Sequence, residues 1–322
     1  MFENMELRQV LRQELEKHME RDERIIVIDA DLAKSNGTFP LRKKFPDRAL
    51  DVGIAEQNMT GIAAGLASYG FIPMIFSYTP FVTRRICDQL SVSIAYSRRN
   101  VKIVGTDPGI SAELNGATHM SVEDVSVVRG IPNIVIVEAA DAVQLSRMLP
   151  VIIAYEGPVY LRLARKVFPI VFPDNYAFDM FSADVLRQGK DVTIVASGLM
   201  LAESLAAAKK LKAMGLSAEV INAHTLKPLD AGTIIASAKK TGAVVTCENS
   251  SIVGGLYSAI CEALCDSYPV PVGAVGIPDR FGEVGKLDYL KKVMHMTADD
   301  IVKKAVEVCV KKGVFRTINS GV

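Results

Sequence analysis

The sequence predicts an α/β protein with two domains, each a mostly parallel sheet flanked by helices. Its 322 residues are enough for two ordinary domains. Short apolar runs rich in β-branched residues alternate with segments whose apolar residues repeat at helical spacing. The short runs are apolar throughout rather than at every second residue, which is typical of strands buried on both faces of a parallel sheet.

The first half contains five apolar runs that we expect to be strands. Residues 7–19 have helical periodicity and predict an amphipathic helix before the first of them. Further helices are expected from about Ala55 and toward Ser97. Asp141 and Gln144 resemble a capping box that opens another helix. The expected strands are 25–29, 71–76, 101–105, 134–137 and 158–163.

The periodicity lapses between Lys166 and Lys190, where prolines interrupt the pattern. We therefore expect a first domain over 1–170, a linker over 171–190 and a second domain over 191–322. The second half restarts with a strand and an Ala- and Lys-rich helix, and residues 297–300 form a good cap for the last helix. The strands expected there are 192–195, 218–221, 243–245 and 270–276.

Composition argues against several classes of protein. Basic and acidic residues number 37 and 36, which leaves no electrostatic footprint for nucleic acid or an anionic membrane. No apolar stretch reaches the roughly 18–20 residues of a membrane span, and no signal peptide is evident. The five cysteines form no framework, and Cys261-x-x-x-Cys265 lacks a second ligand pair, so packing is favoured over zinc. We expect a cytoplasmic protein with no nucleic-acid or membrane partner.

Several loops follow expected strands and carry polar residues. In parallel sheets the carboxyl ends of the strands meet at one edge, where ligands bind. The loops at Asp31, Tyr78, 107–120 and Arg165 leave such ends, so we expect a single site. The long 107–120 loop contains His119, which could take part in proton transfer; for a lone loop histidine a plain hydrogen-bonding role is favoured.

Glu56 begins a helix of small residues and is followed by an aromatic cluster, Phe76, Tyr78 and Phe81. This pattern fits a cofactor pocket, and it fits a buried helix with one exposed glutamate equally well. Asp29 and Asp31 provide two carboxylates for Mg²⁺ but no third ligand.

Other features of the sequence favour structural roles. The two common glycine-rich phosphate loops and the G-x-S-x-G elbow are absent. Gly254-Gly255 opens a helix after a strand, where tight packing is favoured over anion binding. The pairs Arg84-Arg85 and Arg98-Arg99 are expected to be helix-surface charges.

Five motifs resemble one family. Residues 51–59 (Asp-Val-Gly-Ile-Ala-Glu-Gln-Asn-Met), 76–81 and 116–119 resemble the pyrimidine-binding domain of transketolase-type thiamine diphosphate enzymes. Residues 247–255 and 276–285 resemble the transketolase C-terminal domain. The match covers nearly the whole chain in the family's order. One segment distinguishes members of this family. Residues 277–283 (Ile-Pro-Asp-Arg-Phe-Gly-Glu) are more similar to transketolase and deoxyxylulose-phosphate synthase than to the pyruvate-dehydrogenase β subunits.

The resemblance also implies a partner. The family binds the diphosphate through Mg²⁺ (or Ca²⁺) in another domain, with a Gly-Asp-Gly…Asn motif, and this sequence has no Gly-Asp-Gly. Because the sequence starts at Met1, we expect a natural C-terminal subunit of a split transketolase. A separate N-terminal subunit would hold the metal and complete an α₂β₂ enzyme, and the chain alone is expected to form a homodimer.

The resemblance assigns cofactor roles residue by residue. Glu56 matches the glutamate that shares a proton with N1′ of the aminopyrimidine of thiamine diphosphate. Tyr78 and Phe81 match the rings against which the aminopyrimidine stacks. Asp31 and Leu32 match a loop near the thiazolium. No metal ligand is expected in this chain.

The resemblance also implies substrate contacts. His119 matches a histidine that hydrogen-bonds substrate oxygens, which gives it a catalytic role beside Glu56. Asn115 stands where transketolases usually have an acidic residue. Asp107 stands where many transketolases have a histidine, whereas deoxyxylulose-phosphate synthases have an aspartate at that position. The sugars can therefore differ from the usual pentose phosphates. Arginines suit bidentate contacts to phosphate. The substrate-binding residues implied are Arg8, Ser35, Asp107, Asn115, His119 and Arg165.

The expected function is ketol transfer between sugar phosphates by a subunit that is inactive alone. One alternative is a decarboxylating enzyme that joins pyruvate to an aldehyde, as deoxyxylulose-phosphate synthase does. Another is a non-catalytic homologue, which has no need to retain Glu56, His119 and Arg165 together. A nucleotide-binding oxidoreductase is disfavoured because the glycine-rich fingerprint is absent.

Overall fold

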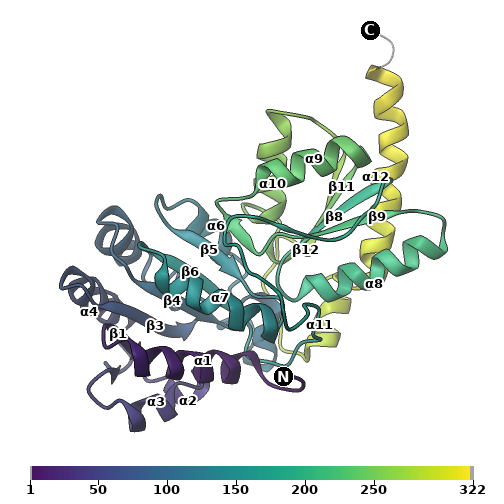
Figure 1. Ribbon diagram of the computed structural model, residues 1–322. Coiled ribbons are helices and arrows are strands. Elements are labelled where there is room, and N and C mark those ends of the chain that lie inside the picture. Colours follow the sequence, from purple (N-terminus) through teal and green to yellow (C-terminus); the bar gives the residue numbers. More distant parts are fainter. Residues whose placement is uncertain (1, 320–322) are drawn as a thin grey trace.

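The computed structural model describes residues 2–319, with side chains up to residue 313, and contains two sheets (Figure 1). The first has seven strands in the order β10-β5-β6-β4-β3-β1-β2. The second has five in the order β12-β11-β8-β9-β7. Ten of these strands form parallel pairs within the two sheets, and β10 and β7 are antiparallel edge strands. The predicted α/β fold of two mostly parallel, helix-flanked sheets is confirmed.

The first sheet is buried on both faces. In β1, Ile25 and Val27 pack with α1 and α7, whereas Ile26 and Ile28 pack with α4 and the helical segment η1 on the other face. Burial on both faces explains why the run has no polar alternation. The strands are β1 (Ile25–Asp29), β2 (Ala49–Asp51), β3 (Ile72–Tyr78), β4 (Lys102–Thr106), β5 (Val135–Glu138), β6 (Val159–Leu163) and β10 (Thr225–Lys227).

The helices around this sheet follow the expected periodicity. Asp141 caps α7 by accepting from the Gln144 amide at 2.7 Å, and the Gln144 side chain accepts from the Ala140 amide at 2.9 Å, which is the predicted capping box. The helices are α1 (Leu7–Arg21), α2 (Ala33–Asn36), α3 (Phe39–Lys44), α4 (Glu56–Ser68), α5 (Cys87–Gln89), η1 (a π-helix, Leu90–Tyr96), η2 (a 3₁₀-helix, Gly109–Asn115), α6 (Asp124–Arg129) and α7 (Ala142–Ala154).

The second sheet is sandwiched in the same way, with α8 and α12 on one face and α9 and α10 on the other. Its strands are β7 (Asp184–Arg187), β8 (Val192–Ala196), β9 (Ala218–Asn222), β11 (Val244–Ser251) and β12 (Val272–Ile277). Its helices are α8 (Met200–Ala213), α9 (Ala231–Thr241), α10 (Leu256–Cys265), α11 (Leu287–Val293) and α12 (Ala298–Asn319).

Two short strands join segments that the sequence analysis kept apart. β10 comes from the second half of the chain and pairs antiparallel with β5 in the first sheet. β7 lies inside residues 171–190 and pairs with β9. The two halves are thus joined by sheet hydrogen bonds as well as by the connecting chain.

The Gly254-Gly255 turn opens α10, and a side chain of this protein already occupies its N-terminus. The Glu248 carboxylate accepts from the amides of Leu256 at 2.7 Å and Tyr257 at 2.9 Å. A Cβ atom at Gly255 would collide with that carboxylate. The glycine therefore permits close packing, as expected, and the helix is capped by the chain's own carboxyl group. Within residues 2–319, no helix has the length and apolar character needed to cross a membrane.

Candidate active site

Glu56 is the first residue of α4, and only 4% of it is exposed. It follows the loop that leaves β2, so its side chain lies at the carboxyl edge of the first sheet. Its carboxylate accepts a hydrogen bond from Arg85 Nη1 at 2.6 Å. The alternative of an exposed glutamate on a buried helix is therefore wrong.

Three rings form a cluster at the same edge. Tyr78 ends β3, Phe81 lies in the turn after it, and His119 comes from the 107–120 loop. The ring centres are 6.2 Å apart for Tyr78–Phe81, 5.2 Å for Tyr78–His119 and 5.3 Å for Phe81–His119. All three pairs meet edge to face, a favourable geometry for aromatic rings. The Thr118 hydroxyl lies 2.8 Å from His119 Nδ1.

Arg85 connects Glu56 to this cluster. Its guanidinium carbon lies 3.8 Å from the centre of the Phe81 ring while Nη1 contacts Glu56. The sequence analysis assigned Arg85 to a helix surface. Arg85 is at the surface, with 42% of its side chain exposed, but it precedes α5 rather than lying on a helix. Sequence spacing gave no signal for this contact, because Arg85 and Glu56 are 29 residues apart.

Four further predicted residues meet beside Tyr78. Asp107 is 1% exposed and accepts from the Arg165 amide at 2.8 Å and from Arg165 Nε at 2.5 Å. Arg165 Nη1 and Arg8 Nη1 both donate to the Ser35 carbonyl, at 3.1 Å and 2.9 Å. The Arg165 guanidinium carbon lies 4.8 Å from the Tyr78 ring centre, so Tyr78 links this group to the ring cluster.

The Asp107–Arg165 pair is partly desolvated, which affects the pKa of both groups. Burial raises the pKa of the Asp107 carboxyl, and the Arg165 guanidinium offsets only part of that rise. Burial acts to lower the pKa of Arg165, but the attraction of Asp107 outweighs it and the pKa is raised. Arg165 therefore remains a cation whose charge is largely balanced by Asp107.

Three predicted residues stand apart from these groups. The Asp31 amide donates to the Asp51 carboxylate at 3.0 Å, with Asp31 in the left-handed region at φ 60°. Asn115 is exposed, and its side chain donates to the Ala112 carbonyl at 3.0 Å within its own 3₁₀-helix. Within the described part of the chain, Asp31, Leu32 and Asn115 have no hydrogen bond or ion pair to the other site residues.

Asp29 is a buried carboxylate with structural partners. It accepts from Asn36 Nδ2 at 2.8 Å and from the Thr38 hydroxyl at 2.6 Å, and burial raises its pKa to about 6. Both of its oxygens are thus engaged by side chains. Over residues 2–313, no group of three or more His, Cys, Asp or Glu side chains is arranged to hold a metal ion.

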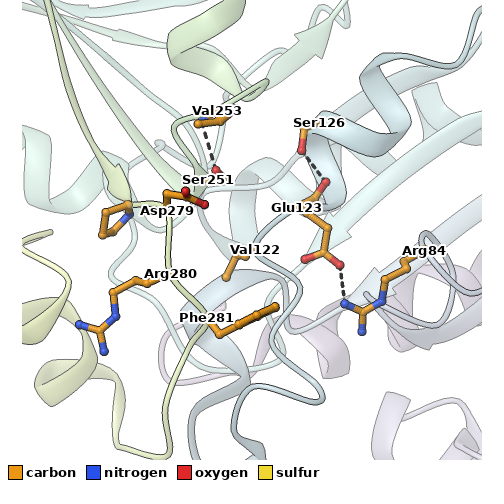
Figure 2. A pocket seen from close by; sticks show the side chains of 10 residues that line it. Arg84, Val122, Glu123, Ser126, Ser251, Val253, Asp279, Arg280 and Phe281 are labelled. Atoms are coloured by element: carbon orange, nitrogen blue, oxygen red, sulfur yellow. Dashed lines mark hydrogen bonds and ion pairs between the residues drawn. The ribbon is translucent and has the colours of Figure 1, made fainter.

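A pocket of about 620 Å³ opens next to this site, between the two halves of the chain (Figure 2). One wall carries Arg84, which pairs with Glu123 at 2.8 Å, and the other carries Arg280 and Phe281. Because Arg84 adjoins Arg85 in the chain, this cleft flanks the Glu56 site. Figure 2 shows the Phe281 side chain, 74% exposed, extending from its own wall toward the wall that carries Glu123 and Arg84.

Comparison with known proteins identifies both halves. The model of the transketolase pyrimidine-binding domain matches residues 3–170, and that of the transketolase C-terminal domain matches residues 182–301. The chain is 50% identical over 296 residues to the 6-deoxy-6-sulfo-D-fructose transketolase subunit SqwH of Clostridium sp. (strain MSTE9), covering 92% of each. It is 37% identical over 288 residues to a putative transketolase C-terminal section of Methanocaldococcus jannaschii, covering 88% of this chain and 90% of the relative.

A solved structure agrees with these relatives. A split-gene transketolase, described as an inactive β4 tetramer, superposes with a TM-score of 0.88 at 39% identity, covering 96% of this chain and 99% of that one. Both domain models and these relatives identify the same part of a transketolase. The chain therefore belongs to the transketolase family, whose members depend on thiamine diphosphate, and it corresponds to the C-terminal subunit of a split transketolase.

Proposed function

We propose that this subunit supplies the pyrimidine-binding half of a transketolase that moves a two-carbon ketol unit between sugar phosphates. One observation carries the proposal: the buried Glu56 carboxylate stands beside the Tyr78, Phe81 and His119 rings, at the strand edge that also holds Arg165. In open α/β sheets this edge is where ligands bind.

The residues present fit the aminopyrimidine of thiamine diphosphate. Arg85 shows the fit, because its planar guanidinium both lies on the Phe81 ring and donates to the Glu56 carboxylate. A planar heteroaromatic ring with a nitrogen at its edge makes the same two kinds of contact. Glu56 would hold a proton at the N1′ atom of that ring, and Phe81 and Tyr78 would fix its plane. When bound, thiamine diphosphate supplies the nucleophilic carbon and accepts the electron pair released by carbon–carbon cleavage.

The remaining site residues suit the substrate. His119 is placed to donate a hydrogen bond to a hydroxyl or carbonyl oxygen of a sugar that lies beside Tyr78 and Phe81. Arg8 and Arg165 converge on the Ser35 carbonyl and form a cationic end of the site for the anionic group of the sugar. We assign the neighbouring Asp107 and Asn115 to substrate choice, and Asp31 and Leu32 to the thiazolium side.

We also propose that another chain supplies the other half of the site. We assign the diphosphate and its Mg²⁺ or Ca²⁺ ion to an N-terminal subunit, because this sequence lacks Gly-Asp-Gly. We further propose an α₂β₂ enzyme, with self-association of this chain when it is alone. The inactive β4 tetramer of the split-gene relative is consistent with both ideas.

A second candidate substrate is a sulfonated sugar. The relative that is 50% identical is named as a subunit of a 6-deoxy-6-sulfo-D-fructose transketolase. The charges at the cationic end also favour a monoanion, since Arg165 is paired with Asp107 and Arg8 with Glu6. Steady-state kinetics with a 6-phospho and a 6-sulfo ketose donor separates the two: the better substrate has the higher kcat/KM.

The test of the proposal is reconstitution with the N-terminal subunit, followed by Glu56→Gln. Loss of general acid–base catalysis should lower kcat at least 100-fold, with an unchanged Tm. Glu14→Gln on the surface of α1 is the matched control and should remain active. A Glu56→Gln enzyme of near-normal rate would overturn the assignment. Release of CO₂ from pyruvate would identify the decarboxylating alternative, and a complex with no turnover of any ketose would support the non-catalytic one.

A further inference from the structure

The 107–120 loop carries three of the site residues, Asp107, Asn115 and His119, and its backbone is strained. Asp107 and Glu113 both have positive φ, at 52° and 49°, and so do Gly109 and Gly116. Such conformations cost about 1–3 kcal/mol each for residues other than glycine and persist only where the surroundings impose them. Something outside the loop must therefore hold its shape.

The second half of the chain provides that support through Asn249, a fully buried residue of β11. Asn249 Oδ1 accepts from the Ile110 amide at 2.9 Å, and Asn249 Nδ2 donates to the Pro108 carbonyl at 2.8 Å. The amide side chain thus binds the backbone on both sides of Gly109. A Cβ atom at Gly109 would collide with Asn249, so glycine is required for this close approach.

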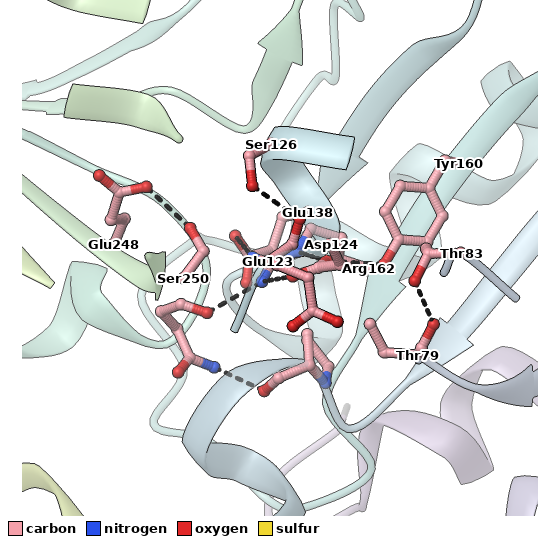
Figure 3. Close-up of polar contacts among 12 residues, drawn as sticks. Thr79, Thr83, Glu123, Asp124, Ser126, Glu138, Tyr160, Arg162, Glu248 and Ser250 are labelled. Carbon is pink, nitrogen blue, oxygen red and sulfur yellow. Dashed lines mark hydrogen bonds and ion pairs between the residues drawn. The ribbon is translucent and has the colours of Figure 1, made fainter. Parts of the chain in front are cut away.

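Asn249 is itself held by a buried ion cluster through Arg162. Figure 3 shows the cluster members Arg162, Asp124, Glu138 and Tyr160. The Asn249 carbonyl accepts from Arg162 Nη2 at 2.9 Å, and Arg162 Nε pairs with Asp124 at 2.6 Å. Arg162 Nη1 also forms an ion pair with Glu138 Oε2 at 2.7 Å, although the geometry is not that of a hydrogen bond. The Tyr160 hydroxyl donates to Asp124 at 2.7 Å. Arg162 is fully buried, so this support for Asn249 is rigid.

The contact at Asn249 lies next to two of these site residues. Asp107 directly precedes Pro108, and it holds Arg165. The Gly109 amide donates across the loop to the Ser121 carbonyl at 3.0 Å, two residues after His119. A shift of the 108–110 backbone would therefore move Asp107 at one end of the loop and His119 at the other.

We infer that Asn249 is a positioning residue: through this side chain the C-terminal half of the chain sets the geometry of residues 108–110 in the substrate-contacting loop. The role assigned to His119 and Asp107 rests on the proposed function. The contact of Asn249 with the backbone of Pro108 and Ile110 rests only on the hydrogen bonds described above. The C-terminal half thereby shapes the site through the loop.

Hydrogen exchange of the isolated chain tests directly whether Asn249 stabilises the backbone of the 107–120 loop. In Asn249→Ala the Ile110 amide loses its acceptor, so exchange in residues 108–121 should accelerate at least tenfold, with little change in β8 and β9. Asn222→Ala is the matched control, because Asn222 is equally buried and donates to Asp184 at 3.2 Å, away from the loop. Unchanged exchange in residues 108–121 of Asn249→Ala would overturn the inference. This measurement needs no activity, so it remains decisive if the ketol-transfer proposal fails.

Kinetics of the reconstituted complex tests the consequence for the site. Asn249→Ala should lower kcat and raise the KM of the ketose several-fold. The Kd of thiamine diphosphate should change less than twofold, because Glu56 and Phe81 lie outside the loop. Asn222→Ala should lower Tm but keep the kcat and KM of the folded enzyme. Asn249→Ser, which retains a small polar group, should show a milder form of the same changes. If Asn249→Ala folds with normal kcat and KM, or if neither variant folds, Asn249 serves the fold alone and the inference is wrong.

Discussion

Arg85 holds the Glu56 carboxylate at 2.6 Å while its guanidinium lies on the Phe81 ring. Arg85 thus contacts the two partners that we assign to the aminopyrimidine. A guanidinium and an aminopyrimidine cannot both lie on the same face of Phe81, so cofactor binding on that face would require Arg85 to move.

The first prediction concerns this competition. Arg85→Ala should tighten binding of thiamine diphosphate to the reconstituted complex about fivefold, because an exposed cation–π contact and its ion pair no longer have to be broken. Calorimetric titration measures the Kd without turnover. Arg84→Ala, which removes the neighbouring pair with Glu123, should leave the Kd unchanged. Weaker binding in Arg85→Ala would show instead that Arg85 helps to hold the cofactor.

The second prediction concerns the anionic group of the sugar. Arg165→Met should raise the KM of a phosphorylated or sulfonated ketose about 10- to 100-fold, the usual effect of losing hydrogen bonds to a charged group. The KM of an uncharged ketose such as erythrulose should stay the same. Arg147→Met on the surface of α7 is the control.

Arg165→Met also leaves the buried Asp107 carboxylate without its cation, so Tm must be measured in parallel. The double variant Arg165→Met/Asp107→Asn removes that charge and should recover stability but keep the high KM. An equal rise in KM for charged and uncharged ketoses would exclude an anion-binding role for Arg165.

The third prediction concerns the buried ion cluster. Arg162→Met leaves Asp124 and Glu138 without their shared cation in the interior, so the free energy of unfolding should fall by about 3–5 kcal/mol. Lys17→Met, which breaks the surface pair with Glu14, should cost less than about 1 kcal/mol. Urea unfolding measures both. A small loss in Arg162→Met would mean that the cluster relaxes or admits water.

The fourth prediction concerns pH. Burial raises the pKa of Asp29 to about 6 in the folded chain, against 3.8 ordinarily, so the folded state binds an extra proton between these values. The stabilising contribution of the neutral carboxyl is therefore complete below about pH 3.8 and is lost as pH rises through 6.

Asp29→Asn removes this titration. Between about pH 4 and pH 6 the wild-type chain should lose stability relative to the variant by up to roughly 1.4 kcal/mol per pH unit, and the difference should be constant above pH 7. Urea unfolding at several pH values measures it, with exposed Asp47→Asn as the control. Parallel pH profiles for wild type and Asp29→Asn would contradict a raised pKa.

Much of the fold and part of the site are encoded locally. Continuous apolar runs such as 25–29 can be stable only as strands covered on both faces, and periodic segments such as 7–19 only as amphipathic helices, so the α/β class follows from the sequence. The loops at the strand ends follow too, which is why Tyr78, Asp107 and Arg165 were expected together. The motif around Glu56 added the family and the kind of cofactor.

Only the tertiary structure decided how distant segments meet. β10 has three residues, too few for a pattern, yet it adds a strand to the first sheet. Arg85 reaches Glu56 across 29 residues, and Asn249 reaches Ile110 across 139. These contacts depend on side-chain direction and on the packing of the two halves, and spacing along the chain carries no information about either.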